Sequence, residues 1–541
     1  MGRVRQRKRT TADVPPRRRS GGQLPEATVC ALAFVALLGI YHANGDFLPG
    51  HDATPNVYLP VSLLNDGNLT FDPQEAPFMF NWKVHTAGGV KSAKRIMSWD
   101  HDPRFRPLYE SGVLEVDKGR YFLLETRKEG EYIGQYGIGA GLAALPVVAV
   151  FHALYGDLMA QPATLWFAAK FAAALLSAAS AVVLYLIART ALSQSAALLI
   201  LCAYALGTNV WSTSSQSLWQ HAPNAFFLTM GIWSWLKIPV VRRFALLSGF
   251  CFASAVLCRP TSAVYVLSAL MFLLLVERRA LLPFIVGGLP IAIALAAFNY
   301  TYLGSPLEFG QTVGGQAIAM SKTGSSEVWR LASIPSHAAG QLLSPSRGLL
   351  IFSPFLLFSF WGIWRIARDR TLLWLRPLVA SALGVMLVTF AWFDWWGGWS
   401  YGPRLLVDTM PVMVVCLLPV MTWILQRRSR LRLFLGLMAW SIAVQATGAF
   451  AYDLAGWNSR LGYPVRLSDS AEAVFADTEA RATKLAAQRG GTVLPPIRRD
   501  IDKAEHRSRL WSVSDNAISY YLTHWSDSRQ RKRRMVATWM K

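Results

Sequence analysis

The chain alternates between long apolar blocks and short polar segments. A first apolar run covers residues 27–42. Further blocks lie at 137–154, 163–188, 192–211, 224–240, 244–258, 261–276, 281–303, 349–364, 372–393, 405–425 and 431–451. Several approach the roughly 20 residues that a helix needs to cross a bilayer. The pattern predicts an all-α polytopic membrane protein whose transmembrane domain covers 27–452, with about 11 spanning helices (about 11 to 13).

Clusters of Arg and Lys between the blocks indicate an orientation. They lie at 1–26, 237–243, 277–279, 365–370 and 427–432. Because cytoplasmic loops are rich in Arg and Lys, we expect these segments in the cytoplasm, the first of them as a disordered basic arm. The segments then expected on the outer side are 44–136, 212–223, 304–347, 394–404 and 453–541.

The longest polar segments are expected to form a first extracytoplasmic loop at 44–136, a second large loop at 304–347 and a small mixed C-terminal extracytoplasmic domain at 453–541. If every apolar block crossed the membrane, that C-terminal domain would return to the cytoplasm. The short, glycine-rich block 137–154, which contains Pro146, is therefore interpreted as re-entrant or lying on the surface. The run 27–42 is interpreted as a signal anchor; a cleaved signal peptide is the alternative.

Composition agrees with a membrane protein. Apolar residues make up 53% of the chain and charged residues 16%, against about 25% charged in soluble domains. A net charge of +22 can indicate nucleic-acid binding, but the charges lie in clusters between apolar blocks, so no nucleic-acid partner is expected. The 5 cysteines all fall in apolar blocks, which predicts neither a disulfide framework nor a cysteine metal site. Phosphate-binding glycine motifs for nucleotides are also missing, so any chemistry on the outer face calls for a pre-activated, lipid-linked donor.

Two short motifs of the first loop can carry chemistry. Asp52 follows the first apolar run closely, so its carboxylate is expected at the membrane–water boundary, where it can act as a general base towards a hydroxyl group. The alternative is a solvated loop acid. Gln135 and Tyr136 precede the glycines of the block 137–154 and place polar groups at the same boundary, or simply begin a glycine-rich helix.

A third outer cluster contains Trp219 and His221. His221 can be an acid–base group, a ligand or a structural residue at the interface. Arg259 lies at a junction between two apolar blocks, where it either binds an anion or extends its side chain to the interface.

The segment 394–404 combines aromatic rings, glycines and an arginine. The rings offer stacking faces for a sugar or lipid, and the Arg404 guanidinium can donate two hydrogen bonds to a phosphate. The alternative is an interfacial aromatic belt. The candidate binding residues here are Asp394, Trp395, Trp396, Trp399, Tyr401 and Arg404.

At these residues the chain resembles the GT-C superfamily of membrane glycosyltransferases, nearest to the branch with protein O-mannosyltransferases and lipid A aminoarabinose transferases. Asp52 with the motifs at 58–64 and 67–69 is similar to the family's acid-bearing first loop, and 136–139 with 145–146 resembles a later conserved segment. Two departures stand out: Ala53 replaces a second acid, and Gln135 replaces a lysine.

The resemblance implies transfer of a sugar from a polyprenyl-phosphate donor, with inversion, to a glycan, lipid or protein acceptor in contact with membrane lipid. It implies that Asp52 is the catalytic base, that Arg404 and Arg259 hold the donor phosphate, and that His221, Trp219 and the residues 395–399 line the pocket. No metal ligands are assigned, although some relatives use a divalent metal. The implied location is a bacterial inner membrane, multi-pass, with a cytoplasmic N-terminus and an extracytoplasmic C-terminus. The alternative class is a transporter or flippase of lipid-linked envelope precursors.

Overall fold

The computed structural model describes residues 24–72, 79, 82–86, 89–93, 115–117, 122–454, 456–459 and 500–539. The predicted basic arm before residue 24, much of the first loop and the C-terminal segment 460–499 lie outside the described residues. The predictions made for those segments therefore stay predictions.

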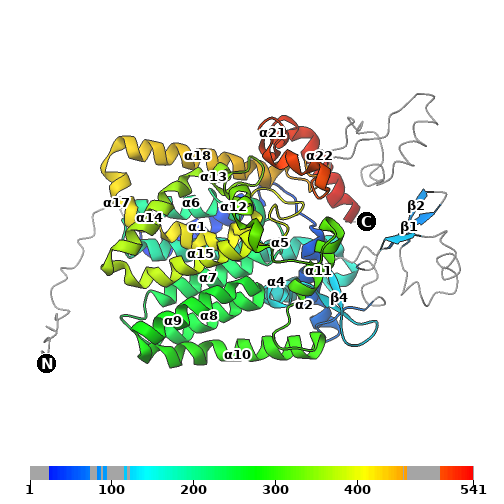
Figure 1. The fold of residues 1–541 in the computed structure, drawn as a ribbon, viewed down its shortest axis with the longest axis horizontal. Coiled ribbons are helices and arrows are strands. Elements are labelled where there is room, and N and C mark those ends of the chain that lie inside the picture. Colours follow the sequence, from blue (N-terminus) through cyan, green and yellow to red (C-terminus); the bar gives the residue numbers. More distant parts are fainter. Residues whose placement is uncertain are drawn as a thin grey trace, which may run out of the picture.

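Helices build the body of the molecule (Figure 1). They are α1 Glu26–His42, α2 Thr54–Asn65, α4 Gly139–Tyr155, α5 Pro162–Arg189, α6 Gln194–Ala205, α7 His221–Trp235, α8 Phe244–Cys258, α9 Ala263–Val276, α10 Arg278–Leu303, α11 Gly310–Thr323, α12 Ile334–Leu343, α13 Leu349–Phe352, α14 Leu357–Arg368, α15 Arg376–Ala391, α16 Met410–Val415, α17 Leu418–Gln426, α18 Arg428–Ala451, α21 Ala517–Thr523 and α22 Trp525–Trp539. Short helical turns join them, among them η1 His51–Ala53, η8 Arg370–Leu375, η9 Arg404–Thr409 and a π-helical turn, η4 Val210–Ser214.

Strands are few and short in the described part of the chain. β1 Trp82–Thr86 pairs antiparallel with both β2 Gly89–Ala93 and β3 Glu115–Asp117, in the order β2-β1-β3. β4 Leu123–Glu125 pairs antiparallel with β5 Tyr132–Gly134. All five belong to the predicted first loop.

The helices follow the apolar blocks of the sequence, which confirms an all-α membrane protein. Among the described residues, four helical segments are long and apolar enough to cross a bilayer: α5, α10, η8 with α15, and α18. A fifth candidate is the segment from η9 to α17, which bends by 61°. Other apolar helices, including α1 and α4, are shorter, so the predicted number of about 11 spans stays a prediction.

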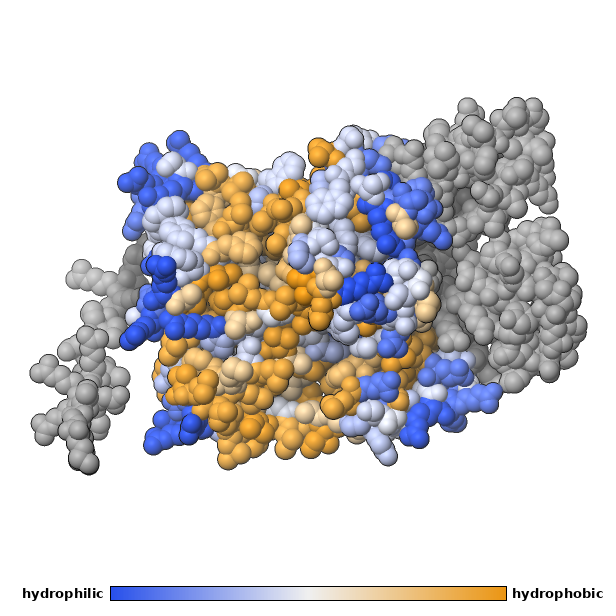
Figure 2. Space-filling model, in the orientation of Figure 1, coloured by the Kyte–Doolittle hydropathy of each residue, from blue (hydrophilic) through white to orange (hydrophobic). Residues whose placement is uncertain are grey.

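The two ends of the helix bundle differ in character. The turns with the predicted cytoplasmic basic clusters, between α9 and α10 and between α17 and α18, lie at one end (Figure 1). The other end carries α2, β4, α11, α21 and α22. Figure 2 shows an apolar surface between two polar ends on the face in view, as expected for a protein that sits across a bilayer.

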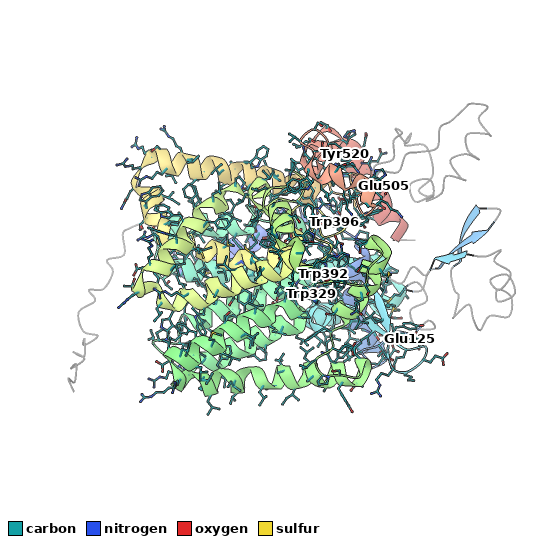
Figure 3. The ribbon with its side chains drawn as sticks, in the orientation of Figure 1. Glu125, Trp329, Trp392, Trp396, Glu505 and Tyr520 are labelled. Atoms are coloured by element: carbon teal, nitrogen blue, oxygen red, sulfur yellow. The ribbon has the colours of Figure 1, made fainter. Side chains whose placement is uncertain are left out.

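The described start of the first loop is helical and buried, although the loop is polar in composition. After η1 the chain forms α2, and residues 54–62 of this helix are buried. The helix packs on α4 and α5 inside the end of the bundle. At the same end, Trp329 and Trp392 meet edge to face with ring centroids 5.2 Å apart (Figure 3), which joins the second loop to the end of α15. Helix α2 of the first loop and Trp329 of the second loop therefore pack against the bundle.

Candidate functional site

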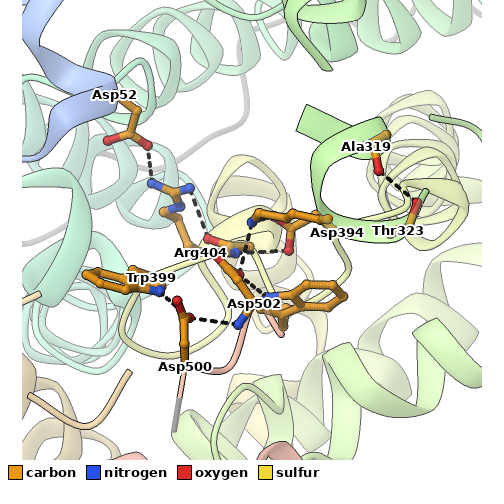
Figure 4. A network of polar contacts seen from close by, with 12 residues as sticks. Asp52, Ala319, Thr323, Asp394, Trp399, Arg404, Asp500 and Asp502 are labelled. Atoms are coloured by element: carbon orange, nitrogen blue, oxygen red, sulfur yellow. Dashed lines mark hydrogen bonds and ion pairs between the residues drawn. The ribbon is translucent and has the colours of Figure 1, made fainter. Parts of the chain in front are cut away.

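Asp52 lies in η1, immediately before the buried helix α2. One carboxylate oxygen accepts a hydrogen bond of 2.8 Å from Trp219 Nε1, and the other forms an ion pair with Arg404 (Figure 4). Gly50 permits this approach, because a Cβ atom there would lie 2.8 Å from Trp219 Nε1. The Asp52 side chain remains 16% exposed, so an incoming hydroxyl group can reach it. Three candidates from distant parts of the sequence therefore meet at one carboxylate.

Arg404 begins η9 at the end of the aromatic segment. Its Nη2 donates to the Gly397 carbonyl at 3.0 Å, and its guanidinium lies 5.4 Å from the Trp219 ring. Its buried Nε has no hydrogen-bond partner within the described residues. The left-handed conformations of Gly397 and Gly398, with φ of 71° and 63°, turn the chain beneath this arginine. The contacts with Asp52 and Gly397 use one N–H of Nη1 and one of Nη2, and the Arg404 side chain remains 16% exposed.

Tyr136 joins this group from the segment before α4. Its carbonyl accepts a hydrogen bond of 2.6 Å from Gln220, the neighbour of Trp219. Burial raises the pKa of Tyr136, and the nearby negative charge of Asp52 raises it further. The phenol is therefore a hydrogen-bond donor at neutral pH.

Gln135 points in another direction. It is 4% exposed and packs against Gly314 of α11. Together with Tyr136 it lines a hollow with about 360 Å³ of empty space, solvent included, between the ends of α8 and α10. The two adjacent candidates thus connect the Asp52 group to a mostly apolar recess.

His221 and Arg259 belong to a second, fully buried group centred on Asp408. The carboxylate of Asp408 accepts a 2.8 Å hydrogen bond from Asn224, and His221 Nδ1 lies 3.2 Å from it. Arg259 Nε forms an ion pair with it at 2.7 Å. Since η9 contains both Arg404 and Asp408, this short helix connects the two groups. The sequence suggested His221 and Arg259 but gave Asp408 no role.

The aromatic side chains of the segment 394–404 contact other parts of the protein. Trp396 Nε1 donates to Asp502 at 2.8 Å and Trp399 Nε1 to Asp500 at 3.0 Å. Tyr401 is buried and donates to the Val444 carbonyl at 2.9 Å. Trp395 packs on α12 at Gly340. Their predicted role as a sugar-stacking surface stays a prediction, and the contacts described here attach the segment to α18, α12 and residues 500–502.

Asp394 helps to fix the same segment. It accepts a hydrogen bond from the Gly398 amide at 3.0 Å and forms an ion pair with Lys322 at 2.7 Å. Lys322 also pairs with Asp502 at 3.0 Å. Burial opposes the charge of Lys322, but the two carboxylates outweigh it and raise the pKa of this lysine. The sequence did not indicate Lys322, because an isolated lysine in a polar loop gives no signal of its partners.

Within the described residues, no group of three or more His, Cys, Asp or Glu side chains is arranged to hold a metal ion.

The apolar helices indicate a membrane protein, and the polar group at one end of the helix bundle is its candidate active site. Residues 146–302 match a family described as dolichyl-phosphate-mannose-protein mannosyltransferase. The match supports the predicted superfamily of membrane glycosyltransferases that use a lipid-linked sugar donor. It covers Trp219, His221 and Arg259 and leaves out Asp52 and Arg404. No curated protein matches the chain.

Proposed function

We propose that the protein transfers a sugar from a polyprenyl-phosphate donor to a hydroxyl group of an extracytoplasmic glycan, lipid or protein, with inversion at the anomeric carbon. The observation that carries the proposal is the pairing of Asp52 with Arg404 and Trp219 at the end of the bundle opposite the basic turns. This arrangement brings to one site a base and a cation, the two groups that sugar transfer from a phosphate uses, and the sugar has to enter between them for attack opposite the phosphate. The family match over residues 146–302 supports the same class of reaction.

In the proposed reaction, Asp52 takes the proton of the acceptor hydroxyl group as the acceptor oxygen attacks the anomeric carbon. The bond from that carbon to the phosphate oxygen breaks, and the electron pair leaves with the polyprenyl phosphate. Arg404 stabilises the negative charge that develops on the leaving phosphate, and the 16% exposure of its side chain supports this role. Attack from the side opposite the phosphate inverts the sugar.

The neighbouring residues have supporting roles in this proposal. Trp219 orients the Asp52 carboxylate through its 2.8 Å hydrogen bond. The Arg259–Asp408 pair is buried, with side chains 6% and 1% exposed, whereas Arg404 is 16% exposed, so the phosphate is assigned to Arg404. Asp408 and His221 fix η9 within the bundle.

The orientation follows from the charges. With the basic turns in the cytoplasm, Asp52 faces the extracytoplasmic side, where a membrane-bound donor replaces a nucleotide sugar. The proposed location is the inner membrane of a bacterium, with the N-terminus in the cytoplasm and the C-terminus outside.

The test is sugar transfer or release from a panel of radiolabelled polyprenyl-phosphate sugars by the purified full-length protein. Asp52→Asn is expected to lose activity by about a hundredfold to ten-thousandfold, the usual contribution of a general base. Arg404→Ala is expected to lose about a hundredfold to a thousandfold. The exposed loop acid in Asp66→Asn is the matched control and is expected to retain activity.

Full activity in a folded Asp52→Asn would remove Asp52 from the chemistry. Donor binding without turnover in the wild type, together with movement of the donor between leaflets of proteoliposomes, would contradict the proposed enzyme and support transport of a lipid-linked precursor.

A further inference from the structure

Arg347 lies between α12 and α13 and is 1% exposed. Its Nε donates to the Trp396 carbonyl at 2.9 Å, and its Nη2 donates to the Gly398 carbonyl at 3.3 Å. The carbonyl between these two, that of Gly397, accepts from Arg404 at 3.0 Å. Three consecutive carbonyls are therefore held by two arginines from different parts of the chain.

The guanidinium of Arg347 has further contacts but no carboxylate partner at ion-pair distance in the described chain. It donates to the Ser346 carbonyl and to Asn458 Oδ1, each at 2.9 Å, and lies 5.3 Å from the Trp457 ring. Burial lowers the pKa of Arg347 to about 10, so the group remains charged at neutral pH. A buried charge without a carboxylate is costly, and a leucine or methionine would fill the same space at lower cost. Unlike leucine or methionine, this arginine donates hydrogen bonds to the carbonyls of the turn.

The turn that it holds needs such support. Gly397 and Gly398 both have left-handed backbone conformations, so their carbonyls point where a regular strand or helix would not place them. In the same turn, the Gly397 carbonyl oxygen accepts the hydrogen bond from Arg404. A small shift of this turn moves the Arg404 guanidinium relative to Asp52.

We propose that Arg347 is a positioning residue: it fixes the turn 396–398 and, through the Gly397 carbonyl, sets the Arg404 guanidinium against Asp52. The effect of Arg347 on turnover rests on the proposed function, because that function gives Arg404 its role. The contact between Arg347 and the turn 396–398 does not depend on the proposed function. A planar guanidinium is required, because an ammonium group cannot donate in one plane to two carbonyls that flank a third.

The first experiment is a double-mutant cycle on kcat/KM for sugar transfer with Arg347→Lys and Arg404→Lys. If Arg347 acts through Arg404, the lysine at 347 lowers kcat/KM about tenfold with Arg404 present and less than twofold in the Arg404→Lys background. The loss is expected in kcat, with KM for the donor changed less than twofold. A purely structural role predicts the same loss in both backgrounds, and that result would overturn the proposal.

The matched control is Arg509→Lys. Arg509 is also buried and donates to the Trp457 carbonyl at 2.9 Å, but it pairs with Asp515. Its substitution is expected to lower the melting temperature and to change kcat/KM by the same small factor in both backgrounds. If the effects of Arg509→Lys and Arg404→Lys on kcat/KM were also non-additive, the coupling would not be specific to Arg347. That result would contradict the proposal.

A second readout does not depend on activity. In hydrogen–deuterium exchange, Arg347→Lys is expected to accelerate exchange several-fold over residues 394–404, where the Gly398 amide donates to Asp394. Unchanged exchange there would overturn the proposal whatever the activity shows. A wild-type protein that transfers no sugar would overturn the proposed function alone, and the exchange experiment would still decide whether Arg347 fixes the turn. If Arg347→Lys does not fold, Arg347→Gln replaces it in both experiments.

Discussion

Arg404 Nη1 and Asp52 Oδ2 form an ion pair although 352 positions separate the two residues in the chain. Both side chains are 16% exposed, so the pair lies at the boundary between the buried bundle and the solvent. The ion pair forms only if η1 and η9 are both held in position. The buried helix α2 positions η1, and the buried group around Asp408 positions η9. The relative position of base and cation therefore depends on the fold of the whole bundle.

Removing the indole donor next to Asp52 should affect turnover more than stability. Trp219→Phe keeps an aromatic ring but loses the 2.8 Å hydrogen bond to the carboxylate. Hydrogen bonds to charged groups contribute about 1.5–3 kcal/mol, so we expect a loss of about tenfold to a hundredfold in kcat/KM for sugar transfer. The control is Trp235→Phe, which loses a 2.8 Å hydrogen bond to the Trp374 carbonyl inside the bundle. This control should lower only the melting temperature; equal activity losses in both variants would argue against a role of Trp219 at Asp52.

The buried group around Asp408 should be essential for stability. Asp408 is 1% exposed and pairs with Arg259 at 2.7 Å. In Asp408→Asn, Arg259 keeps a buried charge without its partner, and breaking such a pair costs about 3–5 kcal/mol. Denaturant unfolding in detergent should show this loss. The double variant Asp408→Asn with Arg259→Met removes both charges and should recover part of the stability, whereas a further loss in the double variant would contradict the pairing.

The sequence predicts the helices well because a segment in lipid must be apolar along its length and must satisfy its own backbone. The blocks 163–188 and 431–451, for example, correspond closely to α5 and α18. It does not predict α2, because residues 54–65 mix prolines, asparagines and apolar residues without a clear period, and their burial comes from packing on α4 and α5.

The candidate site was predictable in part. Asp52, Trp219 and Arg404 stand in short motifs that a resemblance can identify, and they meet in the structure. Asp408 and Arg347 could not be assigned roles, because their partners are backbone atoms and side chains from distant segments. Only tertiary structure determines such contacts.

Lys322 should make stability depend on pH in the alkaline range. The carboxylates of Asp394 and Asp502 raise its pKa above the ordinary value of 10.5, so its contribution to the free energy of unfolding is fully present below pH 10.5. It is lost as the pH rises through the higher folded-state pKa. Lys322→Met removes this contribution at every pH below that range and leaves both carboxylates without their lysine. Thermal melts between pH 8 and pH 12, compared for the two proteins, should therefore converge at the alkaline end; a constant difference would contradict the ion pairs.

The peripheral helix α10 should depend on glycines for its attachment to α8. A Cβ atom on Gly249 would collide with the Phe284 carbonyl, and one on Gly287 with the Leu246 carbonyl, so each helix packs against the backbone of the other. Backbone atoms cannot move aside as a flexible side chain can, and we expect Gly249→Val to destabilise the protein by about 3 kcal/mol or to prevent the two helices from packing. Gly436→Ala is the control, because a Cβ atom at this position in α18 has no neighbour within 4 Å. Since α8 ends next to Arg259, the valine variant should also reduce sugar transfer, and a fully stable and active Gly249→Val would contradict the close packing of these helices.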